Sequence, residues 1–302
     1  MEIIRIKDYK NIEPLPELIA TIGAFDGLHL GHQKLIERCL DSSLKSAVIT
    51  FYPHPDSILK KLSDYPLLMP IEKKEEILEK MGIDYFIIFE FNKEFSMLKK
   101  DEFIQILHIL NVKELVFGYD FRFGYKGEGS IKDLEKEFKI HEQNKYQIDN
   151  VRVSSTYIKE LLSDGNIGLA NTLLGREYSI RGKTFVGSKL GKSYGFPTAN
   201  IDYENYYLPE NGVYLVKVLM DGAMYYGMAN IGHNPTFNFQ NKLRFEVHIF
   251  DIKEEELYGK TLEVFFLKHL REEIKFKNLE ELLNQLRFDK QECINLLNKI
   301  SN

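Results

Sequence analysis

The hydrophobic pattern of this 302-residue chain changes period near its middle. Up to about residue 156, short apolar runs alternate with amphipathic stretches of helical spacing. From residue 178 onward, apolar and polar residues alternate with the period of two that is typical of strands with one buried face. Two such patterns predict two domains of different class, and the chain is long enough to bury a core in each.

The first half is expected to form a doubly wound parallel sheet. Its strand candidates are almost entirely apolar, as in a parallel sheet that is covered on both faces. They lie at residues 18–25, 47–51, 85–91 and 114–117. Helices are expected between them, at 32–40, 71–81 and 102–110. This order predicts right-handed crossovers between parallel strands.

The second half is expected to form an antiparallel barrel or sandwich. Two short helices come first, at 157–163 and 167–174, each ended by a glycine. Strands are then expected at 213–220, 224–231, 243–250 and 261–267, and a final helix at 279–300. We place the boundary after Gly175, which gives domains of residues 1–175 and 176–302.

The composition excludes several classes of protein. A net charge of −5 argues against generic nucleic-acid binding, which needs a basic surface. No apolar run approaches the roughly 18 residues of a membrane span, and no signal peptide is expected. Cys39 and Cys293 lack CxxC partners, so neither disulfides nor a zinc site is expected, and the expected location is the cytoplasm. Cys39 has the spacing of a helix core residue.

A first candidate site is the segment of residues 21–32 (TIGAFDGLHLGH). It places a glycine-rich turn between a buried strand and a helix, where open α/β sheets bind anionic ligands. Imidazole N–H groups of His29 and His32 could donate to a nucleotide triphosphate and stabilise charge as pyrophosphate leaves. Gly27 and Gly31 would let the backbone approach the phosphates. The alternative is that both histidines are part of the turn without a role in ligand binding, but their pairing directly after a strand favours the functional interpretation.

This strand–turn–helix arrangement resembles the nucleotidyltransferase superfamily, whose second motif is Ser-Ser-Thr-x-Ile-Arg. Residues 154–159 (SSTYIK) occupy the expected place, with Lys159 where arginine is usual. Lysine lacks the bidentate fork of arginine, so adenylyl transfer could be weaker or differently arranged. Residues 117–124 (FGYDFRFG) match a segment of bacterial FAD synthetases that lies near nucleotide and flavin, although its aromatic residues could also be core. His54, in a loop that also matches, is left open between stabilising that loop and contacting a ligand.

The resemblance implies a nucleotide site and flavin contacts in the first domain. The nucleotide site would include Gly23, Phe25, Gly31, Asp120, Ser155, Thr156 and Lys159, and the flavin contacts would be Phe121 and Phe123.

Residues 187–193 (GSKLGKS) look at first like a phosphate-binding Walker A loop. Only three residues separate the glycines, where that motif needs four, and the following Gly195 and Pro197 would interrupt a helix. We therefore reject a P-loop ATPase. A glycine-rich loop that covers phosphates from a barrel stays open, with ATP contacts expected from Gly187, Lys189 and Gly191.

A second candidate site follows at residues 195–200 (GFPTAN). Thr198 and Asn200 share one face of an extended segment and could hold Mg²⁺ together with nucleotide phosphates. The alternative is a proline turn with a local hydrogen bond. On a later strand, Glu246 and His248 share a face, and a carboxylate there could take the proton from an attacking hydroxyl. Glu246 could also be an exposed charge, and His248 is expected to be structural.

Six motifs of the second half occur in the order found in the riboflavin kinase domain, which they resemble. They are GFPTAN, 211–214 (NGVY), 229–237 (ANIGHNPTF), the Glu246 strand, 257–259 (LYG) and 270–272 (LRE). The resemblance implies that Thr198 and Asn200 contact metal and ATP, that Glu246 is the catalytic base, and that Arg271 lies near the flavin. With both halves present, the chain resembles the bacterial bifunctional riboflavin kinase/FAD synthetase family.

The resemblance implies two consecutive activities. The C-terminal domain would transfer the γ-phosphate of ATP to riboflavin, and the N-terminal domain would transfer AMP from a second ATP to FMN, releasing pyrophosphate. Riboflavin, FMN and ATP would be the small-molecule partners and Mg²⁺ the cofactor, with neither nucleic acid nor membrane involved. Two alternatives stay open. One is a kinase with a degenerate adenylyltransferase domain, and the other is a flavin- or nucleotide-binding regulator without turnover.

Overall fold

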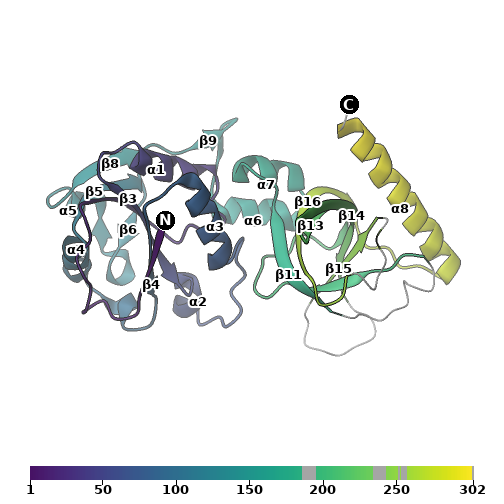
Figure 1. The fold of residues 1–302 in the computed structure, drawn as a ribbon, viewed down its shortest axis with the longest axis horizontal. Coiled ribbons are helices and arrows are strands. Elements are labelled where there is room, and N and C mark those ends of the chain that lie inside the picture. The colour runs from purple at the N-terminus through teal and green to yellow at the C-terminus, as the bar shows by residue number, and fades with distance from the viewer. Residues whose placement is uncertain (186–194, 234–242, 251, 253–256, 301–302) are drawn as a thin grey trace. The chain divides into compact units, whose positions relative to one another are not determined.

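The computed structural model describes the chain except for residues 186–194, 234–242, 251, 253–256 and 301–302. The chain divides into two compact units, Met1–Ser155 and Thr156–Asn302. The first holds a parallel sheet and the second a closed antiparallel barrel, as the change of period predicts (Figure 1). The unit boundary precedes the two-helix segment, whereas the domain boundary expected from the sequence follows it.

The first unit is built on a six-stranded parallel sheet with the strand order β1-β4-β3-β2-β5-β8. Four strands confirm the expected ones: β2 (Leu18–Ile22), β3 (Lys45–Tyr52), β4 (Tyr85–Glu90) and β5 (Val112–Gly118). The edge strands β1 (Glu2–Ile6) and β8 (Lys139–Gln143) were not expected. The main helices are α1 (Leu30–Leu40), α3 (Ile71–Met81) and α4 (Lys100–Ile109). The shorter elements include α2 (Pro55–Leu59), α5 (Ile131–Leu134), β6 (Arg122–Phe123), β7 (Gly129–Ser130), β9 (Gln147–Ile148) and β10 (Val151–Arg152).

Helices cover both faces of this sheet. One apolar core joins Ala20 and Ile22 of β2 to Phe103 of α4. A second core, on the other face, joins Val48 of β3 to α1 and α3. The winding direction reverses at β2, which lies between β3 and β5. The carboxyl ends of β2 and β5 therefore form the switch point, where doubly wound sheets bind their ligands.

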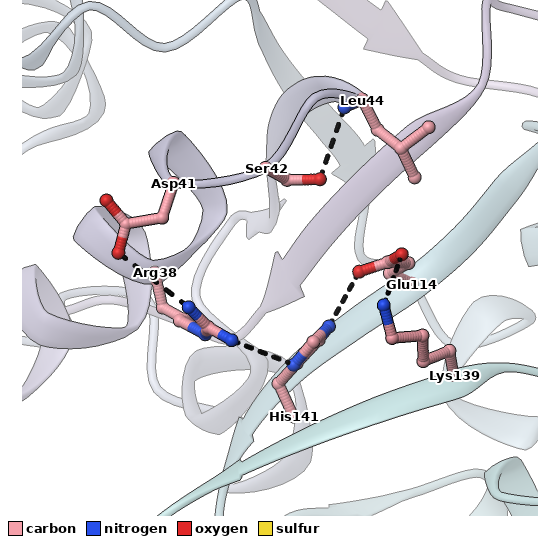
Figure 2. A network of polar contacts seen from close by, with 7 residues as sticks. All are labelled: Arg38, Asp41, Ser42, Leu44, Glu114, Lys139 and His141. Carbon is pink, nitrogen blue, oxygen red and sulfur yellow. Dashed lines mark hydrogen bonds and ion pairs between the residues drawn. The ribbon is translucent and has the colours of Figure 1, made fainter.

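A polar network ties the end of α1 to the sheet, as Figure 2 shows. His141 on β8 lies 2.6 Å from the Glu114 carboxylate on β5, and Arg38 of α1 lies 3.4 Å from its other ring nitrogen. Because the guanidinium can only donate, that nitrogen is the acceptor and the ring proton faces Glu114. Hydrogen bonds from Lys139 and His141 lower the pKa of Glu114. The network fixes the C-terminal end of the helix whose N-terminal end carries His29 and His32.

Helix α6 (Ser155–Ser163) starts at the last residue of the first unit, and the second unit continues with α7 (Ile167–Leu174) and a closed barrel of order β11-β12-β15-β14-β13-β16. Its strands are β11 (Ser179–Phe185), β12 (Ala199–Asp202), β13 (Gly212–Met220), β14 (Ala223–Gly232), β15 (Arg244–Ile249) and β16 (Thr261–Arg271). Phe245 stacks on Phe266 inside the barrel, so the alternating residues Glu246 and His248 lie on its outer face. The final helix, α8 (Leu279–Ile300), confirms the expected one.

Helix α8 packs on the outer face of the barrel through a small apolar cluster. Cys293 is fully buried there with Phe196, Leu215 and Met228. Burial raises the pKa of both Cys39 and Cys293 to about 12, so neither thiol is reactive, and the expected core position of Cys39 is confirmed. Among the described helices, none combines the length and apolar character that crossing a membrane requires.

Candidate active sites

The first candidate site is the tight turn between β2 and α1. Phe25, Gly27 and Leu28 have positive φ angles of 49°, 82° and 41°. A non-glycine residue in this region costs on the order of 1–3 kcal/mol and persists only where its surroundings fix it. The side chains of Phe25 and Leu28 are buried in the core beneath α1 and α3, which holds the turn in this conformation.

The two histidines expected at this turn lie together at the N-terminus of α1. His29 is the N-cap, and its Nδ1 accepts the backbone N–H of His32 at 3.2 Å. The two rings stack with their centroids 3.6 Å apart, and Phe25 contacts His32 edge-on. Because Nδ1 of His29 is an acceptor, its Nε2 carries the ring proton as a donor. A neutral imidazole donor at a helix N-terminus suits a phosphate ligand.

Polar contacts from other parts of the first unit help to hold this turn. The Asp26 carboxylate accepts the backbone N–H of Leu68 at 2.8 Å, and the Asp26 carbonyl accepts the Ser155 hydroxyl at 2.7 Å. The buried Lys74 of α3 donates to the carbonyl of Ala24 at 2.7 Å. Sequence reasoning missed Asp26 and Lys74. The sequence signal for Lys74 was its position on the apolar face of the expected helix at 71–81, where a charged side chain needs a buried partner.

The expected glycines fit closely against aromatic rings of the turn. A Cβ atom added at Gly31 would lie 3.2 Å from the His29 ring, and one at Gly23 would lie 3.4 Å from the Phe25 ring. Gly31 therefore lets the His29 ring pack down on the first turn of α1.

The segment after β5 lies at the switch point, but its aromatic rings are packed into the core of the unit. Phe121 stacks on Phe117 with centroids 3.9 Å apart, and Phe123 is 7% exposed. Asp120 forms an ion pair with Arg152 at 2.5 Å. The flavin contacts of Phe121 and Phe123 and the nucleotide contact of Asp120 stay predictions.

The Ser-Ser-Thr motif spans the boundary between the units. Ser155 lies at the turn through its bond to Asp26, whereas Thr156 and Lys159 belong to the second unit. The Lys159 ammonium lies 5.6 Å from the ring centroid of Tyr207 in that unit. Phosphate contacts of Thr156 and Lys159 therefore stay predictions.

His54 was left open between two roles, and the structure shows the loop-stabilising one. It caps α2 by accepting the backbone N–H of Asp56 at 3.2 Å, and its ring stacks on Tyr65.

The second candidate site lies on the outer face of the barrel. Asn200 on β12 and Asn230 on β14 are both register partners of Glu246 on β15, one on each side. The Glu246 side chain is 13% exposed, and burial raises its pKa, an effect that Arg244 at 3.4 Å and the neighbouring Asn200 amide partly oppose. A base with a raised pKa is better matched to taking a proton from a hydroxyl near neutral pH. Sequence reasoning did not single out Asn230, because only the strand register places it beside Glu246.

Asn200 provides a hard oxygen atom beside this carboxylate, and Thr198 precedes it by two residues in the chain. Asn200 is 5% exposed, and its side-chain amide lies beside the Glu246 carboxylate, whose pKa it lowers. The described residues contain no group of three histidine, cysteine or acidic side chains that could hold a metal. Mg²⁺, which prefers oxygen ligands and keeps phosphates and waters, fits Thr198 and Asn200 together with a nucleotide.

Two further expectations of this site have different outcomes. Gly187, Lys189 and Gly191 lie outside the described residues. The Arg271 guanidinium is bound to Asp289 of α8 at 2.7 Å by Nη2 and 3.0 Å by Nε, and the Asp289 side chain is 1% exposed. Arg271 thus joins β16 to α8, and its flavin contact stays a prediction.

Comparisons with known proteins also divide the chain into two functional domains. The family model described as FAD synthetase matches residues 12–157, and the one described as riboflavin kinase matches residues 174–297. A relative from Bacillus subtilis (strain 168) is 37% identical over 295 residues, covering 91% of each chain. One from Escherichia coli (strain K12) is 34% identical, covering 94% of this chain and 95% of the relative. Both relatives are described as bifunctional riboflavin kinase/FMN adenylyltransferase. The chain belongs to this family.

A solved structure shares the fold of this family member. A chain from Streptococcus pneumoniae, whose title names a macrolide-efflux protein, matches with a TM-score of 0.87 and 30% identity over 97% of this chain and 99% of its own. That title disagrees with the names of the curated relatives, and we take from this likeness the fold alone. The two family models leave most of α6 and all but the end of α7 unmatched between them. The family resemblance read from the motifs is confirmed.

Proposed function

We propose that this chain converts riboflavin to FMN in the barrel and FMN to FAD in the parallel-sheet domain, consuming one ATP at each step. The observation that carries the proposal is that each family domain holds its reactive groups in an ordered, largely buried arrangement. These groups are the stacked pair His29 and His32 in one domain, and Glu246 between Asn200 and Asn230 in the other.

In the barrel, Glu246 takes the proton of the riboflavin 5′-hydroxyl as that oxygen attacks the γ-phosphorus of ATP. The new O–P bond forms as the bond to the β-phosphate oxygen breaks, and ADP leaves. Thr198 and Asn200 would hold the phosphates and a Mg²⁺ ion, which would supply positive charge against the phosphate oxygens. The raised pKa of Glu246 supports its role as the proton acceptor.

In the parallel-sheet domain, a phosphate oxygen of FMN attacks the α-phosphorus of ATP, and pyrophosphate leaves. No covalent intermediate on the protein is needed, because the site acts by alignment and charge stabilisation. His29 and His32 donate to the phosphates at the N-terminus of α1. Gly23, Phe25, Gly31, Asp120 and Ser155 contact the nucleotide in this domain, and Phe121 and Phe123 contact the flavin. Thr156 and Lys159 are proposed as further phosphate ligands, and Arg271, on β16 of the barrel, as the flavin contact of the kinase site.

Neither alternative function is favoured. Both family domains are present, and the histidines of the first site are in place despite Lys159, which disfavours a kinase with a degenerate partner domain. A regulator that only binds flavin would have no use for a buried carboxylate of raised pKa beside the phosphate ligands. We further propose that the enzyme acts in the cytoplasm on small molecules, without nucleic acid or membrane.

A time course of the purified chain with riboflavin, ATP and Mg²⁺ tests the proposal, with the flavins separated by chromatography. We expect FMN to appear first and then to decline as FAD forms. FMN that accumulates without FAD would contradict the adenylyl-transfer step. Flavin that binds without being converted would contradict both steps.

A further inference from the structure

A buried histidine holds the segment that carries Thr198. The Nδ1 atom of His248 on β15 lies 2.7 Å from the carbonyl oxygen of Pro197. A carbonyl can only accept, so Nδ1 carries the proton in this bond. His248 is 6% exposed, and its ring contacts those of Phe196 and Phe250, with centroids 5.4 and 5.8 Å away.

This side-chain bond lies where the strand ladder stops. β12 pairs with β15 at Asn200–Glu246 and Ala199–Val247, and the pairing goes no further. The next residue pair of an antiparallel ladder would join Thr198 to His248. Instead, the imidazole of His248 reaches the carbonyl one residue beyond, at Pro197. Thr198 is thereby fixed from both sides, by the ladder at Ala199 and by the imidazole at Pro197.

The residue before Pro197 is fixed by packing. Phe196 is 9% exposed and belongs to the apolar cluster with Met228 and Cys293. Proline has no N–H and cannot itself donate to a neighbouring strand. Its carbonyl can accept, and it is the group that His248 binds.

We infer that His248 is a positioning residue of the kinase site, which sets the place of the Thr198 hydroxyl and so the affinity for Mg²⁺·ATP. The inference rests on the proposed role of Thr198 and Asn200 as phosphate and metal ligands. Glu246 and His248 lie on one face of β15 and then have different roles in the kinase site. One accepts the substrate proton, and the other holds the segment that binds the nucleotide. A displacement of about 1 Å in such a segment can cost on the order of a hundredfold in rate.

Two substitutions separate the hydrogen bond from the bulk of the ring. His248→Leu fills similar space without a donor, whereas His248→Asn places an amide N–H where Nδ1 stands. We expect His248→Leu to raise the KM for Mg²⁺·ATP in FMN formation by about tenfold or more, with the KM for riboflavin unchanged. His248→Asn should restore most of the loss. Calorimetric affinity for Mg²⁺·ADP, measured without turnover, should follow the same order. The adenylyl-transfer site is unchanged in all variants, so differences between them report on the kinase site.

Thermal unfolding and FMN-to-FAD conversion serve as controls for folding. Should His248→Leu fail to fold, His248→Phe keeps a ring in contact with Phe196 and Phe250 and gives the same comparison. Nucleotide affinity equal to that of the parent chain would overturn the inference, as would equal losses in the donor and non-donor variants. Thr198→Val separates the two proposals. If it weakens Mg²⁺·ATP binding while His248→Leu does not, the inference alone fails; if it has no effect, the role of Thr198 fails as well.

Discussion

The two candidate sites are built in opposite ways. The histidine pair of the candidate adenylyl-transfer site comes from one continuous segment, residues 21–32, in which a strained turn, a helix cap and two stacked rings follow each other along the chain. The kinase site is assembled from three strands, with Asn200, Asn230 and Glu246 brought together by register alone. The first depends on local backbone geometry and the second on the closure of a barrel.

This difference decides what each site is sensitive to. A slip of one residue in β15 would turn Glu246 into the barrel interior and Val247 outward, because side chains alternate between faces. The first site has no such dependence on a distant strand pairing, but it needs the positive φ angles at Phe25 and Leu28. The two activities should therefore fail independently.

The largest expected effect comes from Glu246→Gln, which keeps the shape of the side chain and removes the base. FMN formation should fall by about 10²–10⁴-fold, the usual contribution of a general base. FAD formation from supplied FMN should stay at the parent rate. Separate assays of the two steps make this comparison, and an unchanged rate of FMN formation would show that Glu246 is not the base.

The opposite loss, of FAD formation with FMN formation retained, is expected from His29→Ala combined with His32→Ala. Loss of charge-stabilising donors typically costs about 10²–10³-fold per group, so FAD formation should nearly disappear. FMN formation should persist, because no residue of the barrel is changed. FAD output at the parent level would refute the assignment of the first site.

A third effect concerns stability and the barrel alone. Arg271→Leu leaves the buried carboxylate of Asp289 without its cation, and removing one partner of a buried pair typically costs about 3–5 kcal/mol. Unfolding of the barrel should shift to lower denaturant concentration. The double variant Arg271→Leu with Asp289→Leu should recover much of the loss, whereas an equal loss in both would contradict a structural pair.

The pH dependence of the two steps should also differ. FMN formation needs ionised Glu246, whose pKa burial raises, so the rate should fall on the acid side at a higher pH than for an ordinary glutamate. Arg244 lowers this pKa, so Arg244→Gln should move the acid limb to still higher pH. Rate profiles of FMN formation for both chains test this, with FAD formation as the reference that should not move. An acid limb that stays in place or moves to lower pH would contradict the account.

The smallest effect tests the local packing of the first site. Gly31→Ala places a methyl group 3.2 Å from the His29 ring, which has to move by a few tenths of an ångström. We expect FAD formation to fall about fivefold, equivalent to ~1 kcal/mol, with FMN formation unchanged. Gly168→Ala in α7 is the matched control, because no atom lies within 4 Å of its added Cβ. Equal effects of the two substitutions on FAD formation would argue against contact with His29.

The contrast between the sites also explains what the sequence could predict. The central strands β2 to β5 were predictable because they are apolar on both faces, and His29 and His32 because their motif is local. The edge strand β8 was missed, since its sequence KIHEQ is polar and carries none of the apolar signal of a buried strand. β1 was missed at the opposite edge of the same sheet.

Residues whose roles depend on distant partners were the hardest to interpret. Asn230 gains its place beside Glu246 only through the register of β14 with β15. Arg271 is bound to Asp289, 18 residues further along the chain, in a contact that no local pattern indicates. His248 was expected to be structural, and its bond to the Pro197 carbonyl joins segments 51 residues apart.

The central claim is that two independent sites on one chain carry out consecutive steps, and a mixing experiment tests it most directly. The Glu246→Gln chain and the His29→Ala/His32→Ala chain are each supplied with riboflavin, ATP and Mg²⁺, first separately and then together. We predict FAD only in the mixture, because FMN made by the intact barrel of one chain is adenylylated by the intact sheet domain of the other. No FAD in the mixture, or FAD from either chain alone, would contradict the account.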